Sequence, residues 1–274
     1  MTNAAETAAT DELLFSVDEG GIARITLNRP QARNALTFAM YRGLVELCGR
    51  IEEDRAIKAV IIAGAGDKAF AAGTDIAQFR SFDKPEDALG YERFMDRVLG
   101  SLERLRVPTI AAIAGACTGG GAAIAAACDM RIASRDARFG IPIARTLGNC
   151  LSQNTLRRLA NLIGAPRVKD ILFTARLVGA EEALAIGLVN EMVEDAAAVA
   201  ERATALAALL ASHAPLTLQA TKEGLRRIAE EGVAEAVADE RPGDDLIVMT
   251  YMSEDFREGM EAFLAKRPPA FKGR

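Results

Sequence analysis

Residues 107–128 carry no charged side chain. As a single helix, such a stretch would be long enough to cross a bilayer. Pro108 and the triplet Gly119-Gly120-Gly121 argue against a single helix, because proline removes a backbone donor and successive glycines favour a turn. The stretch therefore predicts a buried strand at 109–114 and a buried helix at 121–128, joined by a tight glycine turn. No membrane partner is expected.

Hydrophobic periodicity extends this alternation of strands and helices toward both ends of the chain. Short apolar runs predict strands at 14–17, 22–27, 58–63, 109–114 and 130–133. Apolar residues at helical spacing predict one helix that is capped near Thr37 and another at about 85–106. Beyond residue 152 the pattern is mostly helical, with Gly164, Gly187 and Pro215 as breaks. The succession predicts a layered α/β core.

Composition excludes several classes of function. With 33 basic against 38 acidic residues, the chain offers no basic face for nucleic acid. A single histidine, His213, and four cysteines without a CxxC pair argue against a zinc site and a Ser-His-Asp triad, so no metal is expected. The cysteines are expected to be reduced core thiols of a cytoplasmic protein. Residues 1–23 contain no Lys, Arg or apolar core of a secretory signal.

Two glycine-bearing segments carry the chemistry of this sequence. They read AFAAGTD at 69–75 and CTGGGAA at 117–123, each at a predicted strand-to-helix junction. A glycine triplet alone is most often a tight turn. A helix N-terminus, however, leaves N–H donors unpaired and carries partial positive charge, so a developing oxyanion is stabilised there without a charged side chain. Two such turns together indicate the two halves of an oxyanion hole.

These turns, with LNRPQARNAL at 27–36, CDMRIAS at 128–134 and a tail reading REGMEAFLAKRPPAF, resemble the enoyl-CoA hydratase/isomerase (crotonase) superfamily. The resemblance implies an α/β fold, a crotonase-like spiral of ββα units with a helical C-terminal part. Residues 1–10 are expected to be a disordered lead-in, and the resemblance implies a spiral core at 11–194 and a C-terminal part at 195–274 that contributes CoA contacts and trimerisation. The expected partners are an acyl-CoA substrate, with no separate cofactor, and further copies of the chain in a homotrimer or dimer of trimers.

The resemblance assigns site residues one by one. The backbone N–H groups of Thr74 and Gly120 become the donors of the oxyanion hole for a thioester enolate. Asp75 also fits the N-cap of the helix that follows it, and we favour that role over a catalytic acid. Asp129 matches a position that holds structure. The residues expected at the substrate or CoA are Arg29, Arg33, Ala72, Asp75, Ile76, Phe263 and Lys266.

Two carboxylates that hydratases of the superfamily use are replaced in this chain, where Ala123 and Ile143 stand. If each acid–base group contributes about 10²- to 10⁴-fold, losing both costs about 5 to 11 kcal/mol of barrier stabilisation. No Asp or Glu lies between Asp136 and Asp170, so Arg145 becomes a candidate for the acyl pocket that would favour an anionic acyl group. The alternatives left open are an enoyl-CoA hydratase-type lyase or isomerase, a decarboxylase of a malonyl-type thioester, and a non-catalytic acyl-CoA binder.

Overall fold

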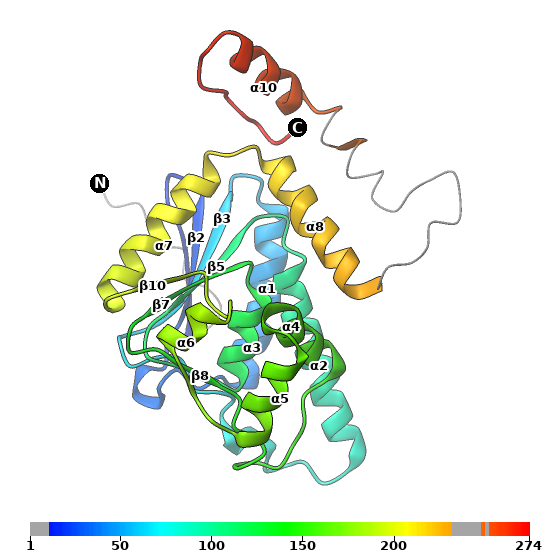
Figure 1. Ribbon diagram of the computed structural model, residues 1–274. Helices are drawn as coiled ribbons and strands as arrows, with labels where there is room; N and C mark the ends of the chain where they lie inside the picture. The colour runs from blue at the N-terminus through cyan, green and yellow to red at the C-terminus, as the bar shows by residue number, and fades with distance from the viewer. Residues whose placement is uncertain (1–10, 232–247, 250–251) are drawn as a thin grey trace.

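The computed structural model describes residues 11–231, 248–249 and 252–274. The larger of its two β-sheets has six strands (Figure 1). The strand order is β1-β2-β3-β5-β7-β10, in which β1 runs antiparallel to β2 and all other neighbours are parallel. The expected lead-in at 1–10 lies outside the described residues. The strands are β1 (Leu13–Val17), β2 (Ile22–Leu27), β3 (Ala59–Gly64), β5 (Thr109–Ile113), β7 (Met130–Ser134) and β10 (Glu191–Val193).

A second sheet of four short strands has the order β4-β6-β8-β9. Its members are β4 (Ala69–Ala71), β6 (Ala116–Thr118), β8 (Arg138–Gly140) and β9 (Val178–Gly179). Strands β3, β5 and β7 of the first sheet are followed in the chain by β4, β6 and β8 of the second. Each turn of the chain therefore places one strand in each sheet, which is the predicted spiral of ββα units.

Gly115 forms the corner at which the chain passes from β5 to β6. It has φ +63°, and a Cβ there would lie 2.2 Å from the Lys68 carbonyl oxygen, so only glycine fits. The expectation of one strand running directly into a turn was incomplete, because β6 intervenes. No helix within the described ranges is long and apolar enough to cross a membrane, in agreement with the division of residues 107–128 into β5, β6 and a helix.

Helices cover both faces of the larger sheet. On one face lie α1 (Phe38–Glu53), α2 (Pro85–Glu103) and α3 (Gly120–Ala127), and on the other lies α7 (Ala196–Ala211), whose Val199, Ala203 and Leu206 pack on alternate strand residues such as Ile61 and Ile110. Thr37 caps α1 as predicted, because its hydroxyl accepts a hydrogen bond from the Met40 N–H. The short 3₁₀ helices are η1 (Pro30–Ala32) and η2 (Ile76–Phe79).

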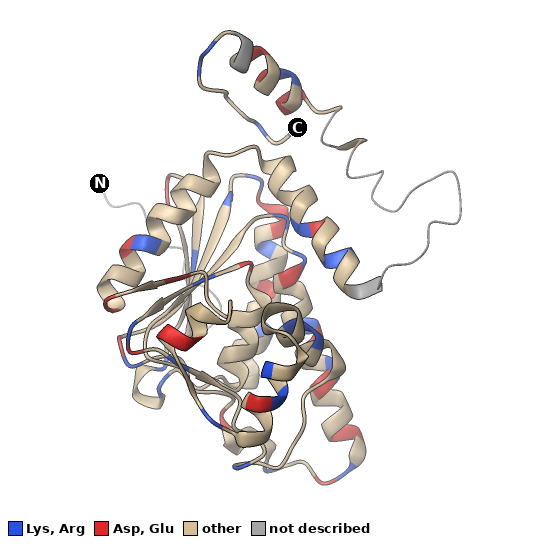
Figure 2. Cartoon of the chain, in the orientation of Figure 1, with Lys and Arg blue, Asp and Glu red and all other residues tan. Residues whose placement is uncertain are grey.

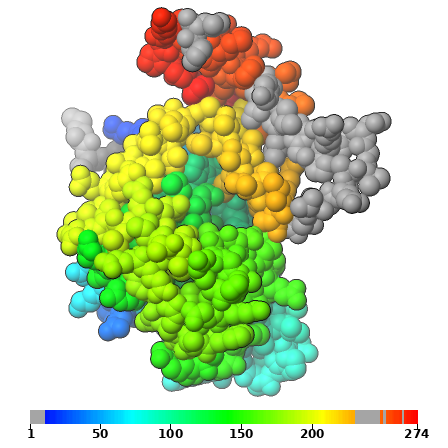
Figure 3. All heavy atoms as spheres, viewed as in Figure 1, coloured from blue at the N-terminus to red at the C-terminus, as the bar shows by residue number. Residues whose placement is uncertain are grey.

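Other helices in the described part of the chain are α4 (Gln153–Ile163), α5 (Ala165–Thr174), α6 (Ala180–Ala185), α8 (Pro215–Glu231) and α10 (Glu254–Leu264). In Figure 1, α10 and the C-terminus lie beyond the ends of α7 and α8, apart from α3. Acidic and basic residues alternate along the outer helices in Figure 2 rather than gathering by sign. Figure 3 shows a hollow between α8 and the helices around α4, a groove of about 580 Å³ that Lys222 and Leu225 line from α8.

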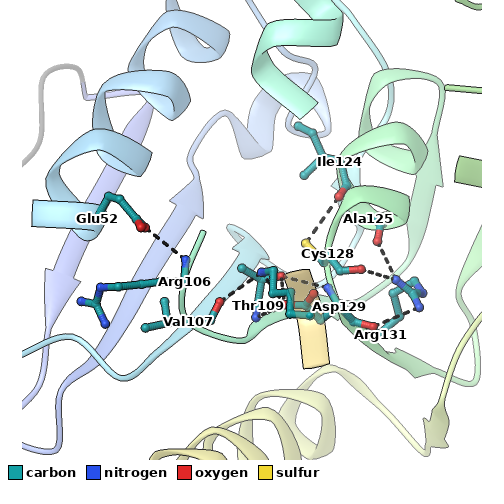
Figure 4. Close-up of polar contacts among 10 residues, drawn as sticks. Glu52, Arg106, Val107, Thr109, Ile124, Ala125, Cys128, Asp129 and Arg131 are labelled. Atoms are coloured by element: carbon teal, nitrogen blue, oxygen red, sulfur yellow. Dashed lines mark hydrogen bonds and ion pairs between the residues drawn. The ribbon is translucent and has the colours of Figure 1, made fainter. Parts of the chain in front are cut away.

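Asp129 has the structural role that was expected of it (Figure 4). Its Oδ2 accepts hydrogen bonds from the Thr109 N–H (2.7 Å), the Thr109 hydroxyl (2.8 Å) and the Lys222 ammonium (2.7 Å). Next to it, the buried Arg131 guanidinium donates to the carbonyls of Ala125 and Cys128 at the end of α3. These contacts satisfy carbonyls that a helix C-terminus leaves open, and they fix α3 between β5, β7 and α8.

Candidate functional site

The two predicted glycine turns lie against each other. Parallel pairing of β4 with β6 brings their ends to the same edge of the small sheet. Gly73 (φ +108°) follows β4, Gly119 (φ +53°) caps α3, and a Cβ on Gly119 would lie 3.2 Å from the Gly73 Cα. The positive φ of the triplet belongs to Gly119, whereas Gly120 begins the helix, one residue earlier than predicted.

The turns present two unused donors to one cavity. Within the described part of the chain, neither the Thr74 nor the Gly120 N–H donates a backbone hydrogen bond. Both residues line a cavity of about 210 Å³. The Gly120 N–H is at the N-terminus of α3, where the peptide dipoles favour negative charge and no acidic side chain is present in the first turn. The arrangement can stabilise an oxyanion.

A chain of hydroxyl groups runs beside the donors. The Thr74 hydroxyl lies 2.8 Å from the Tyr41 hydroxyl and 3.1 Å from that of Tyr91. Tyr41 is fully buried in the core, and burial raises the pKa of both tyrosines, so their phenols stay neutral. The Tyr41 hydroxyl also leaves no room for a side chain at Gly120, because a Cβ there would lie 2.1 Å from the Tyr41 oxygen. The threonine hydroxyl is thus fixed next to the donor N–H groups.

The cavity wall includes a carboxylate that the sequence had not suggested. Glu92 of α2 lines the cavity with Met95 and Leu99 of the same helix face, and it carries the only acidic or basic side chain among the described lining residues. Its Oε2 accepts a hydrogen bond from the Ser152 N–H at 3.2 Å. Burial raises the pKa of Glu92, Asp96 adds to the effect and the Ser152 N–H opposes it. A half-buried carboxyl of this kind can accept and release protons.

Ala123 and Ile143 both line the cavity, as expected for the acyl pocket. Arg145 is exposed and is not among the lining residues, and the loop contributes Thr146 and Leu147 instead. Cys150 also lines the cavity and is exposed, so the expectation of four core thiols was wrong for this residue, whereas Cys48, Cys117 and Cys128 are buried.

The residues expected at the substrate or CoA are divided between the cavity and its surroundings. Ala72 and Ile76 line the cavity. Asp75 is the N-cap of η2, accepting a hydrogen bond from the Ala77 N–H, and it also pairs with Arg29 at 3.1 Å. The Arg29 guanidinium also forms an ion pair with Glu12 at 3.0 Å. Two carboxylates of the same chain, those of Glu12 and Asp75, therefore balance the charge of Arg29.

Arg33 and Lys266 are exposed, and both have positive φ. Lys266 follows α10, which Figure 1 places apart from α3, so this chain does not bring it to its own cavity. The side chain of Phe263 lies outside the described residues.

Sequence reasoning missed Glu92, Tyr41 and Tyr91. The sequence pattern could have indicated Glu92, because this residue stands three positions before Met95 on the apolar face of its helix. A carboxylate at that position interrupts a face that is otherwise buried. Tyr41 likewise stands three residues before the buried Leu44.

Comparison with known proteins gives consistent matches along nearly the whole chain. Residues 18–274 match the family model for enoyl-CoA hydratase/isomerase. A short-chain-enoyl-CoA hydratase from Clostridium acetobutylicum is 37% identical over 257 residues, 93% of this chain and 96% of that protein. A crotonyl-CoA hydratase from Syntrophomonas wolfei is 32% identical over 253 residues, 92% of this chain and 95% of that protein. The structure of an enoyl-CoA hydratase/carnithine racemase from Magnetospirillum magneticum has a TM-score of 0.88 and 36% identity, covering 97% of both chains.

Proposed function

The chain is an enzyme that belongs to the enoyl-CoA hydratase/isomerase family, and we propose that it binds an acyl-CoA thioester and stabilises its enolate through the N–H groups of Thr74 and Gly120. The observation that carries the proposal is that two N–H groups without backbone partners line one cavity, at touching turns. One donor of this kind is typically worth about 2.7 to 4 kcal/mol in the transition state, or 10²- to 10³-fold in kcat.

The cavity wall favours enolate chemistry over addition of water. Hydration needs a base for the water and an acid for the α-carbon. Ala123 and Ile143 supply neither, and they line the cavity beside the donors. We therefore expect slow hydration of crotonyl-CoA.

The charge of the cavity also bears on the decarboxylase alternative. A malonyl-type thioester carries a carboxylate that would need a cationic partner. The single charged side chain of the described cavity lining is Glu92, and Arg145 is exposed outside it. A neutral acyl group suits this wall better.

The nucleotide end of CoA carries phosphates, and Arg33 and Lys266 are the exposed cations proposed to meet them. Since α10 lies apart from α3, we propose that the tail serves the cavity of a neighbouring copy in a trimer or paired trimers. The exposed Leu225 and Ile228 of α8, along the groove in Figure 3, support such an interface. Light scattering should report a trimer or hexamer, and a monomer at all concentrations would contradict this assembly.

Calorimetry tests binding, and a panel of saturated, 2-enoyl, 3-enoyl and carboxylated CoA thioesters followed by mass spectrometry tests turnover. We expect the thioester to bind much more tightly than the free acid, and a neutral thioester to be converted. Equal affinity for thioester and acid would overturn the proposal. Binding without conversion of any thioester would identify a binder, and loss of CO₂ from a malonyl thioester would identify a decarboxylase.

A further inference from the structure

Glu92 is the sole carboxylate among the described residues that line the cavity. The other polar side chains there belong to threonines, Tyr91, Asn149 and Cys150, and the raised pKa of Tyr91 keeps its phenol protonated, so that no phenolate is present to act as a base. Among the described lining residues, the candidate for an acid–base group at the α-carbon of a bound thioester therefore lies on α2.

The position of Glu92 is tied to the oxyanion turn through its neighbour on the helix. Tyr91 hydrogen-bonds with the Thr74 hydroxyl at 3.1 Å, and Thr74 supplies one of the two donor N–H groups. Met95 and Leu99, on the same face of α2 as Glu92, complete that side of the cavity. A thioester whose oxygen lies at Thr74 and Gly120 would therefore share one cavity with the Glu92 side chain.

The carboxylate also retains capacity for a proton. Its Oε2 accepts the Ser152 N–H at 3.2 Å, and a carboxylate offers about four lone-pair sites. Burial raises the pKa of Glu92, which makes its carboxylate a stronger base than an exposed one.

We propose that Glu92 is the acid–base residue of this cavity and moves a proton between carbons 2 and 4 of a 3-enoyl thioester. This inference rests on the proposed function. The Glu92 carboxylate takes a proton from carbon 2, and the C–H electron pair forms the enolate whose oxygen the two N–H groups hold. The enolate pair then moves so that a double bond forms between carbons 2 and 3, the bond between carbons 3 and 4 becomes single, and carbon 4 takes the proton back from the Glu92 carboxylic acid. Atoms and electrons balance with no co-reactant, and one carboxyl group is sufficient.

The purely structural alternative is that Glu92 only anchors Ser152, which in turn donates to Asp96 at 2.7 Å and caps α4. Glu92→Gln separates the two roles, because the amide oxygen still accepts the Ser152 N–H whereas the amide is no base. Glu86→Gln is the matched control, an exposed carboxylate on the same helix.

The experiment measures three quantities for each protein: acyl-CoA affinity by calorimetry, incorporation of deuterium at carbon 2 of a saturated thioester in D₂O, and conversion of a 3-enoyl to a 2-enoyl thioester. For Glu92→Gln we expect unchanged affinity and a fall of about 10²- to 10⁴-fold in both rates. Glu86→Gln should match the parent. Undiminished rates in Glu92→Gln would overturn the assignment. A parent that binds thioesters but neither exchanges nor isomerises them would overturn it too, whereas a parent that binds none would overturn the proposed function itself.

A measurement on the parent enzyme covers the case in which the variant fails to fold. A 3-enoyl thioester labelled with deuterium at carbon 2 should give a 2-enoyl product with part of the label on carbon 4, because one group carries it across. Complete absence of label from carbon 4 would overturn the transfer by a single residue.

Discussion

Gly120→Ala tests the oxyanion hole with a single methyl group. A Cβ at this position would lie 2.1 Å from the Tyr41 hydroxyl oxygen and 3.0 Å from that of Thr74. Tyr41 cannot turn aside, because its side chain is fully buried and packs edge-on against Phe94. The first turn of α3 must therefore shift, and the Gly120 N–H moves with it.

The expected magnitude follows from two separate costs. Overpacking in a rigid core typically destabilises a protein by about 1 to 3 kcal/mol. Misplacing one oxyanion donor costs up to about 2.7 to 4 kcal/mol in the transition state, equivalent to 10²- to 10³-fold in kcat. Gly120→Ala should thus fold with a lowered thermal midpoint and lose most of its turnover.

The assay is kcat with the fastest thioester of the panel, and Tyr41→Phe provides a rescue because it removes the clashing oxygen. Tyr41→Phe alone should stay within about tenfold of the parent, since it removes one hydrogen bond worth about 1 kcal/mol while Thr74 keeps Tyr91. The double variant should recover at least about tenfold relative to Gly120→Ala. Gly49→Ala, where nothing lies within 4 Å of the new Cβ, is the neutral control. Parent-like turnover in Gly120→Ala, or no recovery in the folded double variant, would refute the placement of the donor.

Three further outcomes are expected. The base form of Glu92 is lost as pH falls through its raised pKa, so kcat/KM should decline below a midpoint higher than about 4.3, the ordinary value for glutamate, and a midpoint at or below that value would contradict the role. Asp129→Asn leaves the partly buried Lys222 ammonium without its carboxylate and should lower the free energy of unfolding by roughly 1 to 3 kcal/mol in urea titrations; an unchanged unfolding midpoint would count against the structural role. Combining Ala123→Glu with Ile143→Glu should raise crotonyl-CoA hydration, measured by loss of the enoyl absorbance, and efficient hydration by the parent would show that the acid and base lie elsewhere.

The strands and the donor turns were predictable because their signals are local. Strands β2, β3 and β5 are apolar runs of ordinary length, and Thr37 stands where a capped helix must begin. Strand β6 escaped prediction because three residues, Ala116–Thr118, give no periodicity and are defined only by pairing with β4 and β8. The division of each spiral turn between two sheets escaped prediction for the same reason, because it depends on which strands pair with each other.

The acid–base candidate escaped prediction because Glu92 is far in sequence from the segment that it contacts in the fold. Residues 136–170 contain no acid between their end points, yet the Ser152 N–H in that interval contacts Glu92, sixty residues away in the chain. Arg145 was proposed for the pocket from the same interval and is exposed. Sequence order therefore located the two glycine turns that meet at the cavity, and it did not locate the charged side chain that lines it.

The helix that carries the carboxylate affects the pKa of that carboxylate. Ala123 is the fourth residue of α3, near the helix N-terminus, where the peptide dipoles would stabilise a carboxylate and lower its pKa. Glu92 lies seven residues after the start of α2, away from both helix ends, and burial instead raises its pKa. In the proposed mechanism, the dipole of α3 is then available to the enolate oxygen alone, while Glu92, which would accept and return the proton, holds it more readily. A single carboxyl on α2 is better suited to carrying one proton between two carbons than to sharing the activation of water with a second acid.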